Sequence, residues 1–215
     1  MSAASTPTSI QTTERLRRVP RQGRSRDKVR RILDASDALL ANEGAPALVT
    51  TRVASEAGVA VGSVYSYFPD KEAIVEALAL RYWSAVTDAI AAAVHADAAE
   101  PVDDPVQAVL DAVVAAFRGS AGFRALWFSP LRTERIRDVT RPLRTEVGAL
   151  VERLLAVHWP QTDAGARAVA ARMLVLAGDG LLREAFRLDP DGEPTVLEEG
   201  HAMLAAYLAA RLEEA

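Results

Sequence analysis

The chain has 215 residues, half of them hydrophobic and a quarter charged, which suffices for one large domain or for a small and a medium one. The absence of cysteine excludes disulfides, thiolate metal sites and a cysteine nucleophile. No stretch reaches ~18 uninterrupted apolar residues and the opening residues lack a signal-like apolar region, so we expect a cytoplasmic protein with no membrane partner.

The formal net charge of −4 is distributed unevenly along the chain. Residues 1–75 contain eleven basic and eight acidic residues, whereas residues 76–215 contain fourteen and twenty-one. Residues 1–31 alone contain nine basic and two acidic residues. An excess of Lys and Arg at one end is typical of a segment that contacts phosphate groups.

Residues 1–23 are rich in Ser, Thr, Pro and Arg and have no periodic apolar face, so we expect them to be disordered in isolation. The run RLRRVPRQGRSR is either a solubilising tail or a basic arm that lies along the minor groove of DNA. We favour the arm because a DNA-reading motif follows, and we include Arg24 and Arg26 among the expected DNA contacts.

A first helix is expected from Ser25 to the residue before Gly44, with Pro46 preventing its continuation. Its apolar residues recur at helical spacing, with a gap at Ser36. They are Val29, Ile32, Leu33, Leu39 and Leu40.

Residues 50–69, TTRVASEAGVAVGSVYSYFP, predict two short helices that are joined at Gly58. Thr50 or Thr51 is expected to cap the first helix. Gly58 provides the positive φ of a tight turn, and the small Ala54 lets the two helices cross closely. A simple helical hairpin shows two or three of these features by chance, but the complete set favours a helix-turn-helix.

Further helices follow in chain order. Asp70 is expected to cap a long helix over about residues 70–95, which links two domains. The remaining helices are expected at about 104–118, 132–157, 163–187 and 194–213, with Gly119 and Gly122 bracketing a turn. The sequence thus predicts an all-α chain of about nine helices.

The run GVAVGSVYSYFPDKEAIVEAL resembles the TetR family of bacterial transcriptional repressors, and VRRILDASDALLANEGAPALVTTRVASEAG resembles the preceding part of that family's N-terminal domain. The resemblance covers about residues 25–82, and the polar stretch between the threonine pair and the Ala-Gly turn is shorter than in many members. It implies a three-helix DNA-binding domain (24–70), preceded by the arm (1–23) and followed by a helical domain for effector binding and dimerisation (71–215).

The second helix of the motif is expected to read base edges through Val61 and Ser63 at its start, and Gly62 is expected to let the backbone approach the DNA closely. The resemblance implies that Tyr65, Tyr67 and Lys71 contact phosphates. At the start of the preceding helix we expect backbone contacts from Thr50, Thr51 and Arg52, and Arg52 is the residue most able to reach a base.

One short recognition helix buries little surface, so we expect two copies on double-stranded DNA with a palindromic operator. The helices at about 163–187 and 194–213 are apolar on most sides, which predicts a homodimer through them, and the resemblance implies a four-helix bundle. A filled protein core is the alternative explanation of their composition.

For each apolar residue of the second domain taken alone, a filled core is the better explanation. For the group, the resemblance implies that these residues line a pocket for an unknown small hydrophobic or amphipathic effector. They are Leu110, Val113, Phe117, Phe123, Trp127, Phe128, Leu143, Val147, Met173 and Leu176. His95 and His158 are expected at the surface or in a cap, and Asp179 stands out in an apolar helix.

These features predict a dimeric repressor that an effector releases from its operator. An activator and a DNA-binding protein without an effector are the alternatives. We expect no enzyme, because the chain contains no glycine-rich phosphate loop after a strand and no His-x-x-x-His pair. No cofactor or metal is expected.

Overall fold

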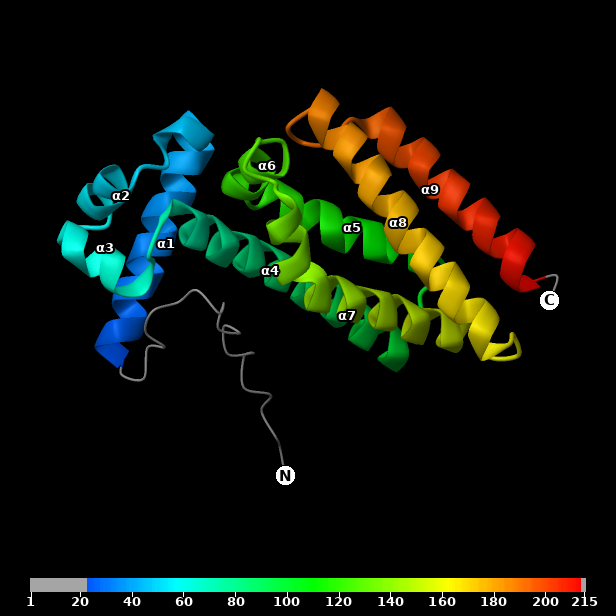
Figure 1. Cartoon of the computed structure of the whole chain (residues 1–215). Coiled ribbons are helices and arrows are strands. Elements are labelled where there is room, and N and C mark those ends of the chain that lie inside the picture. Colours follow the sequence, from blue (N-terminus) through cyan, green and yellow to red (C-terminus); the bar gives the residue numbers. More distant parts are fainter. Residues whose placement is uncertain (1–22, 214–215) are drawn as a thin grey trace. The chain divides into compact units, whose positions relative to one another are not determined.

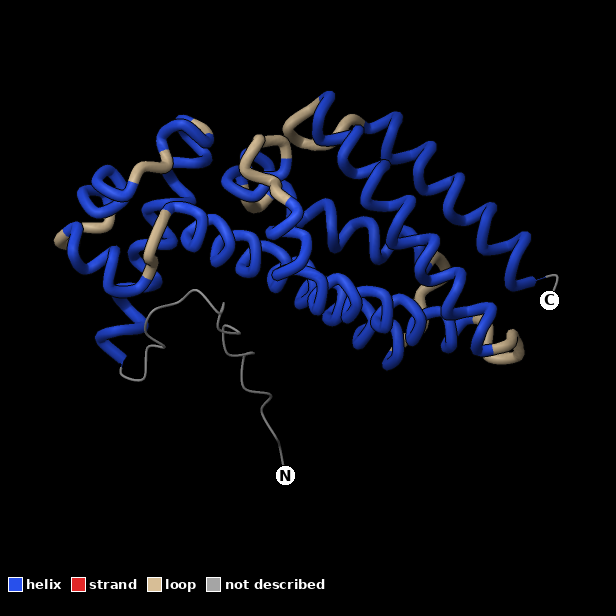
Figure 2. The backbone as a smooth tube through the Cα atoms, viewed as in Figure 1, coloured by secondary structure: helices blue, strands red, loops and turns tan. Residues whose placement is uncertain are grey.

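The computed structural model describes residues 23–213, which form nine α-helices and no strand (Figures 1 and 2). The helices are α1 (Gly23–Glu43), α2 (Thr50–Glu56), α3 (Val61–Tyr67), α4 (Lys71–Ala99), α5 (Pro105–Arg118), α6 (Ala121–Trp127), α7 (Glu134–His158), α8 (Ala164–Leu188) and α9 (Pro194–Leu208). A 3₁₀ turn follows α1 at Ala45–Ala47, and a π turn follows α9 at Ala209–Glu213. The predicted all-α class is confirmed.

The chain divides into two compact units. The first contains residues up to Arg81 together with Ala125–Val139, and the second contains Tyr82–Arg124 and Thr140–Ala215. Helix α4 runs through the division. The predicted N-terminal arm (residues 1–23) lies almost entirely outside the described residues, so it stays a prediction, as do the limits of the functional domains.

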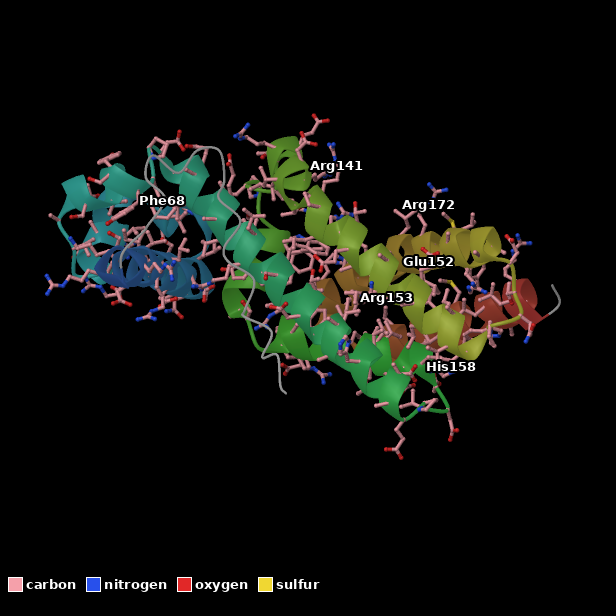
Figure 3. All side chains as sticks on the ribbon, turned by 90° about the horizontal axis from the view of Figure 1, so that it is seen from below. Phe68, Arg141, Glu152, Arg153, His158 and Arg172 are labelled. Carbon is pink, nitrogen blue, oxygen red and sulfur yellow. The ribbon has the colours of Figure 1, made fainter. Side chains whose placement is uncertain are left out.

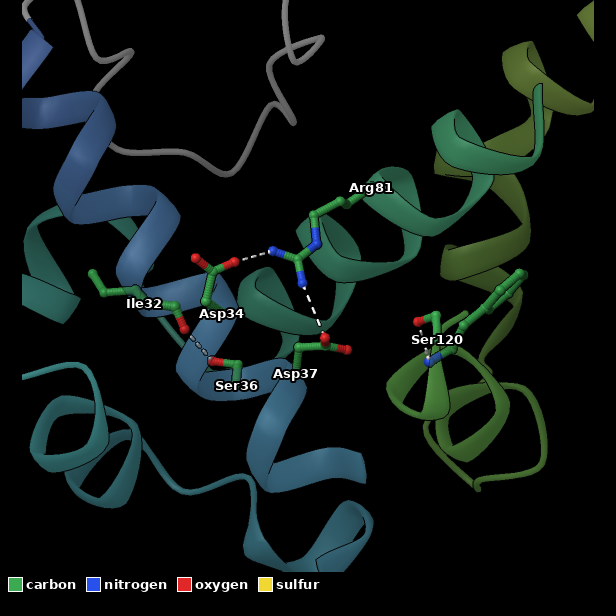
Figure 4. Close-up of polar contacts among 7 residues, drawn as sticks. Ile32, Asp34, Ser36, Asp37, Arg81 and Ser120 are labelled. Carbon is green, nitrogen blue, oxygen red and sulfur yellow. Dashed lines mark hydrogen bonds and ion pairs between the residues drawn. The ribbon is translucent and has the colours of Figure 1, made fainter. Parts of the chain in front are cut away.

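The core of the first unit contains the apolar residues of α1 that the helical spacing predicted, and Val53 and Phe68 join them. Ile32, Leu40, Val53 and Phe68 are fully buried there, and Phe68 lies among the helices of this unit in Figure 3. Ser36 interrupts the apolar face of α1, yet it is buried because its hydroxyl donates to the carbonyl of Ile32 at 2.7 Å (Figure 4). A buried serine is tolerated when its hydroxyl is hydrogen-bonded.

Ion pairs join distant segments within the first unit. Arg81 of α4 donates to Asp34 of α1 at 2.6 Å, and its other nitrogen lies 3.2 Å from Asp37 (Figure 4). Arg135, at the start of α7, donates through Nε to the carboxylate of Glu76, which is buried in α4. The sequence analysis placed no charged side chain in this core.

The second unit is built around α8 and α9, which pack against each other and against α5. Phe117 and Phe186 stack with ring centroids 5.0 Å apart, and Phe123 lies 5.1 Å from Tyr82. Four aromatic rings from α4, α5, α6 and α8 thus form part of its core.

Two details of the second unit differ from what the sequence predicted, and a third gives the partner of a residue that stood out in the sequence. Gly122 lies inside α6 and does not bracket a turn. His158 is not a surface residue: its Nε2 lies 2.9 Å from the carboxylate of the buried Asp97. Asp179 accepts a hydrogen bond from Arg183, one turn further along α8, at 3.0 Å.

Among the helices of residues 23–213, none is by itself long and apolar enough to cross a membrane. One bent pair, α5 with α6, passes that test by length and composition only.

Candidate nucleic-acid interface

The turn between α2 and α3 has the geometry that Gly58 predicted. Gly58 has a φ of 61°, in the left-handed region that favours glycine. Its N–H donates to the carbonyl of Ser55 and the N–H of Val59 donates to that of Ala54, at 3.2 and 3.0 Å. This pair of bonds is a Schellman motif, which satisfies the last carbonyls of α2 and turns the chain toward α3.

Buried side chains fix the angle between the two short helices. Val53 and Ala54 of α2, Val64 of α3 and the following Phe68 are all buried. Each helix has only seven residues and is too short to be stable alone, so this packing determines its position. The opposite sides of both helices are left exposed.

The start of α2 differs from the prediction. The N-cap residue is Val49, no side chain caps the helix, and Thr50 is its first residue, so the prediction that Thr50 or Thr51 caps α2 is wrong. The hydroxyl of Thr50 instead lies 3.0 Å from the hydroxyl of Tyr65 in α3, and either group can be the donor. This hydrogen bond joins the two helices on their solvent side.

Helix α3 begins at Val61, as predicted. Val61 and Tyr65 are 38% and 42% exposed, and Gly62 is exposed as well. Ser63 and Tyr67 are half-buried. Large apolar side chains that remain exposed next to polar ones indicate a contact surface.

Helix α4 is capped by Asp70, whose carboxylate accepts the N–H of Ala73 at 2.8 Å, as predicted. Lys71 is half-buried at its first position. An ammonium group beside the positive end of a helix dipole favours an anion at that place.

Basic side chains near the motif differ in their surroundings. Arg24 and Arg26 are exposed near the start of α1, and Thr51 is exposed in α2. Arg52 forms two hydrogen bonds to the carboxylate of Glu43, the last residue of α1, at 2.9 and 2.6 Å. The bond from Arg52 lowers the pKa of Glu43 below its ordinary value, and the same contact raises the pKa of Arg52.

The residues predicted to line an effector pocket are only partly brought together. Leu110, Val113, Phe117, Phe123, Leu143, Val147, Met173 and Leu176 belong to the second unit, whereas Trp127 and Phe128 belong to the first. Val113, Phe117, Phe123 and Val147 are buried.

Three of these residues require correction. Met173 and Leu176 are 37% and 57% exposed on α8, because they lie on the side of that helix that faces away from the interior of the unit. Phe128 is also exposed, since it follows the end of α6 and points out of the core. None of the three is an interior residue.

Two residues on the exposed side of the helix-turn-helix were not predicted from the sequence. Val49 is an exposed apolar side chain directly before Thr50. Glu43 is brought to Arg52 by the turn between α1 and α2. No short-range spacing signals either one, because both depend on how the chain folds back between two helices.

Comparison with known proteins identifies the family. A model of bacterial regulatory proteins of the tetR family matches residues 32–78, and a model of the tetracyclin repressor-like C-terminal domain matches residues 100–212, more than half of the chain. An uncharacterized HTH-type transcriptional regulator of Haemophilus influenzae is 40% identical over 58 residues. That match covers 27% of this chain and 31% of the relative, so the chain spans less than a third of its length.

Solved structures have the same fold. A TetR-family regulator from Streptomyces coelicolor superposes with a TM-score of 0.65 at 27% sequence identity. The match covers 86% of this chain and 99% of the regulator. The multidrug binding protein EbrR, solved with malachite green, has a TM-score of 0.61 at 23% identity and covers 83% of this chain and 96% of its own. The chain therefore belongs to the TetR family of bacterial transcriptional regulators, as its own residues implied.

Proposed function

We propose that the chain is a dimeric repressor that binds a palindromic operator through α2, α3 and the start of α4, and that a small effector releases it. The observation that carries the proposal is the exposed side of the helix-turn-helix. There Val61, Gly62 and Tyr65 remain uncovered although the opposite side is fully packed.

The expected contacts divide by role. Val61, Gly62 and Ser63 lie at the start of α3, where a recognition helix penetrates most deeply into the major groove. Thr50 and Tyr65 are joined by their hydroxyls, so one phosphate oxygen can accept from the pair. Lys71 and Tyr67 complete the phosphate contacts, with Thr51, Arg52, Arg24 and Arg26 at the edges.

The proposed dimer uses α8 and α9. Val169, Met173 and Leu176 recur at helical spacing on α8 and are exposed, and Met203 of α9 is 51% exposed. Exposed large apolar side chains on two adjacent helices are typical of a surface that another protein covers. A second copy is the occupant that suits a palindromic operator, because two-fold symmetry in the protein matches that of the DNA.

The effector proposal rests on the second unit and on its relatives. Val113, Phe117, Phe123 and Val147 supply the apolar and aromatic surroundings that small-molecule sites in helical bundles use. The multidrug binding protein EbrR, which has the same fold, was solved in complex with malachite green. In a dimer, the two helix-turn-helix units are either spaced to fit the operator or further apart. An effector that binds the second arrangement more tightly lowers the operator affinity by the difference between its two binding free energies, and α4 would be the connecting element.

Substitutions distinguish the residues that contact phosphates from those that contact base edges. Lys71→Ala and Tyr67→Ala are expected to weaken binding to all duplexes alike, because phosphate contacts carry no sequence information. Ser63→Ala is expected to relax preference at one base pair by about 1–3 kcal/mol. Binding is measured by fluorescence anisotropy on the operator and on single-base-pair variants of it. Equal losses from all three variants on every duplex would show that this division of roles is wrong.

A further inference from the structure

Glu43 and Arg52 form a two-pronged ion pair at the edge of the helix-turn-helix. Nη1 of Arg52 donates to one carboxylate oxygen of Glu43 at 2.9 Å, and Nη2 donates to the other at 2.6 Å. Both side chains are 48% exposed, so the pair is open to solvent and to a partner. The contact spans nine residues of sequence and joins the end of α1 to the first turn of α2.

This pair engages the only basic side chain between the end of α1 and the cap of α4. Between Gly44 and Asp70 the sequence contains no Lys or Arg other than Arg52. A guanidinium group is always charged, so Arg52 does not lose its positive charge by deprotonation. Only an anionic partner can neutralise that charge. In the free protein that partner is Glu43.

The fork that binds a carboxylate also matches a phosphate or the edge of a guanine. Arginine binds carboxylate and phosphate through the same two parallel N–H groups, and it binds guanine O6 and N7 in the same manner. Glu43 and DNA therefore compete for one face of one side chain.

From this geometry we infer that Glu43 is an internal competitor for Arg52, which weakens binding to DNA of arbitrary sequence. The inference rests on the proposed DNA-binding function. Non-specific binding comes almost entirely from Lys and Arg that replace counterions on phosphates. A helix-turn-helix whose Arg52 is already neutralised by Glu43 keeps less of this affinity. A correctly placed guanine edge still compensates Arg52 for the loss of Glu43, because it offers two acceptors to the same guanidinium group.

A purely structural role for the pair is the competing explanation. Glu43 ends α1, where the helix dipole disfavours a carboxylate, and the last turn of α1 contains no basic residue. Arg52 compensates that charge. Exposed ion pairs stabilise a fold only slightly, however, so this role predicts almost no effect on DNA binding.

The test uses the full chain, duplex DNA of random sequence and a series of salt concentrations. For Glu43→Gln we expect tighter binding and a plot of log K against log salt that is steeper by about 0.9 per protomer, the value for one additional phosphate contact. In a chain that already contains Arg52→Gln, Glu43→Gln is expected to leave the slope unchanged. It should raise the affinity for DNA at most slightly, because it removes one negative charge.

Helix α8 provides a matched control. Arg187 also donates two hydrogen bonds to one carboxylate, that of Glu184, here through Nε at 2.9 Å and Nη2 at 2.5 Å, and this pair is also exposed. It lies in the second unit, outside the helix-turn-helix. Because α8 belongs to the proposed dimer, light scattering verifies that Glu184→Gln has the same mass as the unaltered chain. Glu184→Gln removes the same charge, so it is expected to leave the salt slope unchanged. Thermal unfolding by circular dichroism verifies that all variants are folded.

The outcomes are distinguishable. A steeper slope for Glu43→Gln that depends on Arg52 supports the inference. An unchanged slope, or a gain that persists without Arg52, overturns it while leaving DNA binding intact. Weaker binding by Glu43→Gln also overturns it, because Glu43 would then orient Arg52 toward DNA. If the unaltered chain does not bind duplex DNA even at low salt, the proposed function itself fails.

Discussion

Gly58 and Gly62 lie four residues apart in the same motif but are required for different reasons. Gly58 has a φ of 61°, whereas Gly62 lies within α3 and has no positive φ. A Cβ atom at either position meets nothing within 4 Å. The cost of a side chain at Gly58 is therefore backbone strain, and the cost at Gly62 arises only when a partner approaches.

The two substitutions are expected to have opposite effects. Gly58→Ala is expected to destabilise the fold by about 1–2 kcal/mol, because an L-residue is strained in the left-handed region. Gly62→Ala is expected to stabilise α3 by roughly 0.5–1 kcal/mol and yet to weaken DNA binding, because the new methyl group occupies the place where α3 meets the groove. Urea denaturation and anisotropy measure the two quantities. Unimpaired DNA binding by Gly62→Ala would contradict the proposed approach of α3.

The ion pair of Glu43 makes stability depend on acidity. The pKa of Glu43 is lowered by its hydrogen bond to Arg52, from an ordinary value of 4.5. A carboxyl group with a lowered pKa contributes stability above its unfolded pKa and loses it as the pH falls through the folded pKa. The melting temperature of the unaltered chain is thus expected to exceed that of Glu43→Gln by a constant small margin at pH 5–7, and the margin should shrink below about pH 4.5. A margin that grows in acid would refute this.

At this scale the sequence predicts local features and misses those that depend on the tertiary fold. Gly44 after α1, the positive φ of Gly58 and the cap by Asp70 each follow from residues within a few positions of one another. The bond between Thr50 and Tyr65 spans fifteen residues, and it exists because the turn brings α2 and α3 together. Thr50 does not cap α2 because it is the first residue of the helix and Val49 occupies the N-cap position.

Helices α8 and α9 provide the clearest test among the larger elements. Leu176→Glu is expected to convert the proposed dimer into a folded monomer, because a carboxylate at the centre of an apolar interface has no partner there. Light scattering coupled to size exclusion measures the mass. Val102→Glu changes an exposed apolar residue outside these two helices and should leave the mass unchanged. A dimer that tolerates Leu176→Glu would place the interface elsewhere.

The buried carboxylate of Glu76 makes the stability of the first unit depend on Arg135. Removing the charged partner of a buried carboxylate leaves that group without one of its compensating hydrogen bonds. Arg135→Ala is therefore expected to lower the free energy of unfolding by about 1–3 kcal/mol. Arg30→Ala, which removes an exposed ion pair with Asp27, is the control and should change stability by less than about 0.5 kcal/mol.

Helix positions follow from the sequence more reliably than the contents of the core. The predicted helices at about 104–118, 163–187 and 194–213 agree with α5, α8 and α9 because proline, glycine and a capping Asp mark their ends. Helix α6 was missed, since Gly122 suggested a turn, whereas Ser120 accepts the N–H of Phe123 and starts a helix there. Helical periodicity alone gives no sign that Glu76 is buried.

At the scale of the whole molecule, tight binding to the proposed operator requires two copies of the chain. A single seven-residue recognition helix buries too little surface for tight specific binding, and an inverted repeat presents two equivalent half-sites to a two-fold dimer. In the proposed function, an effector acts by changing how the two helix-turn-helix units of the dimer are placed relative to each other. The family and the fold follow from the sequence, but the effector does not, because its recognition depends on pocket shape that no motif encodes.

Whether two copies act together on DNA is tested by selecting random duplexes on the purified chain and determining the mass of the complex on the enriched duplex by light scattering. The account predicts an inverted repeat with half-site centres about 34–36 Å apart, or a multiple of that spacing, bound by an even number of protomers. Enrichment of a site without two-fold symmetry that one protomer occupies, or no enrichment at all, would contradict it.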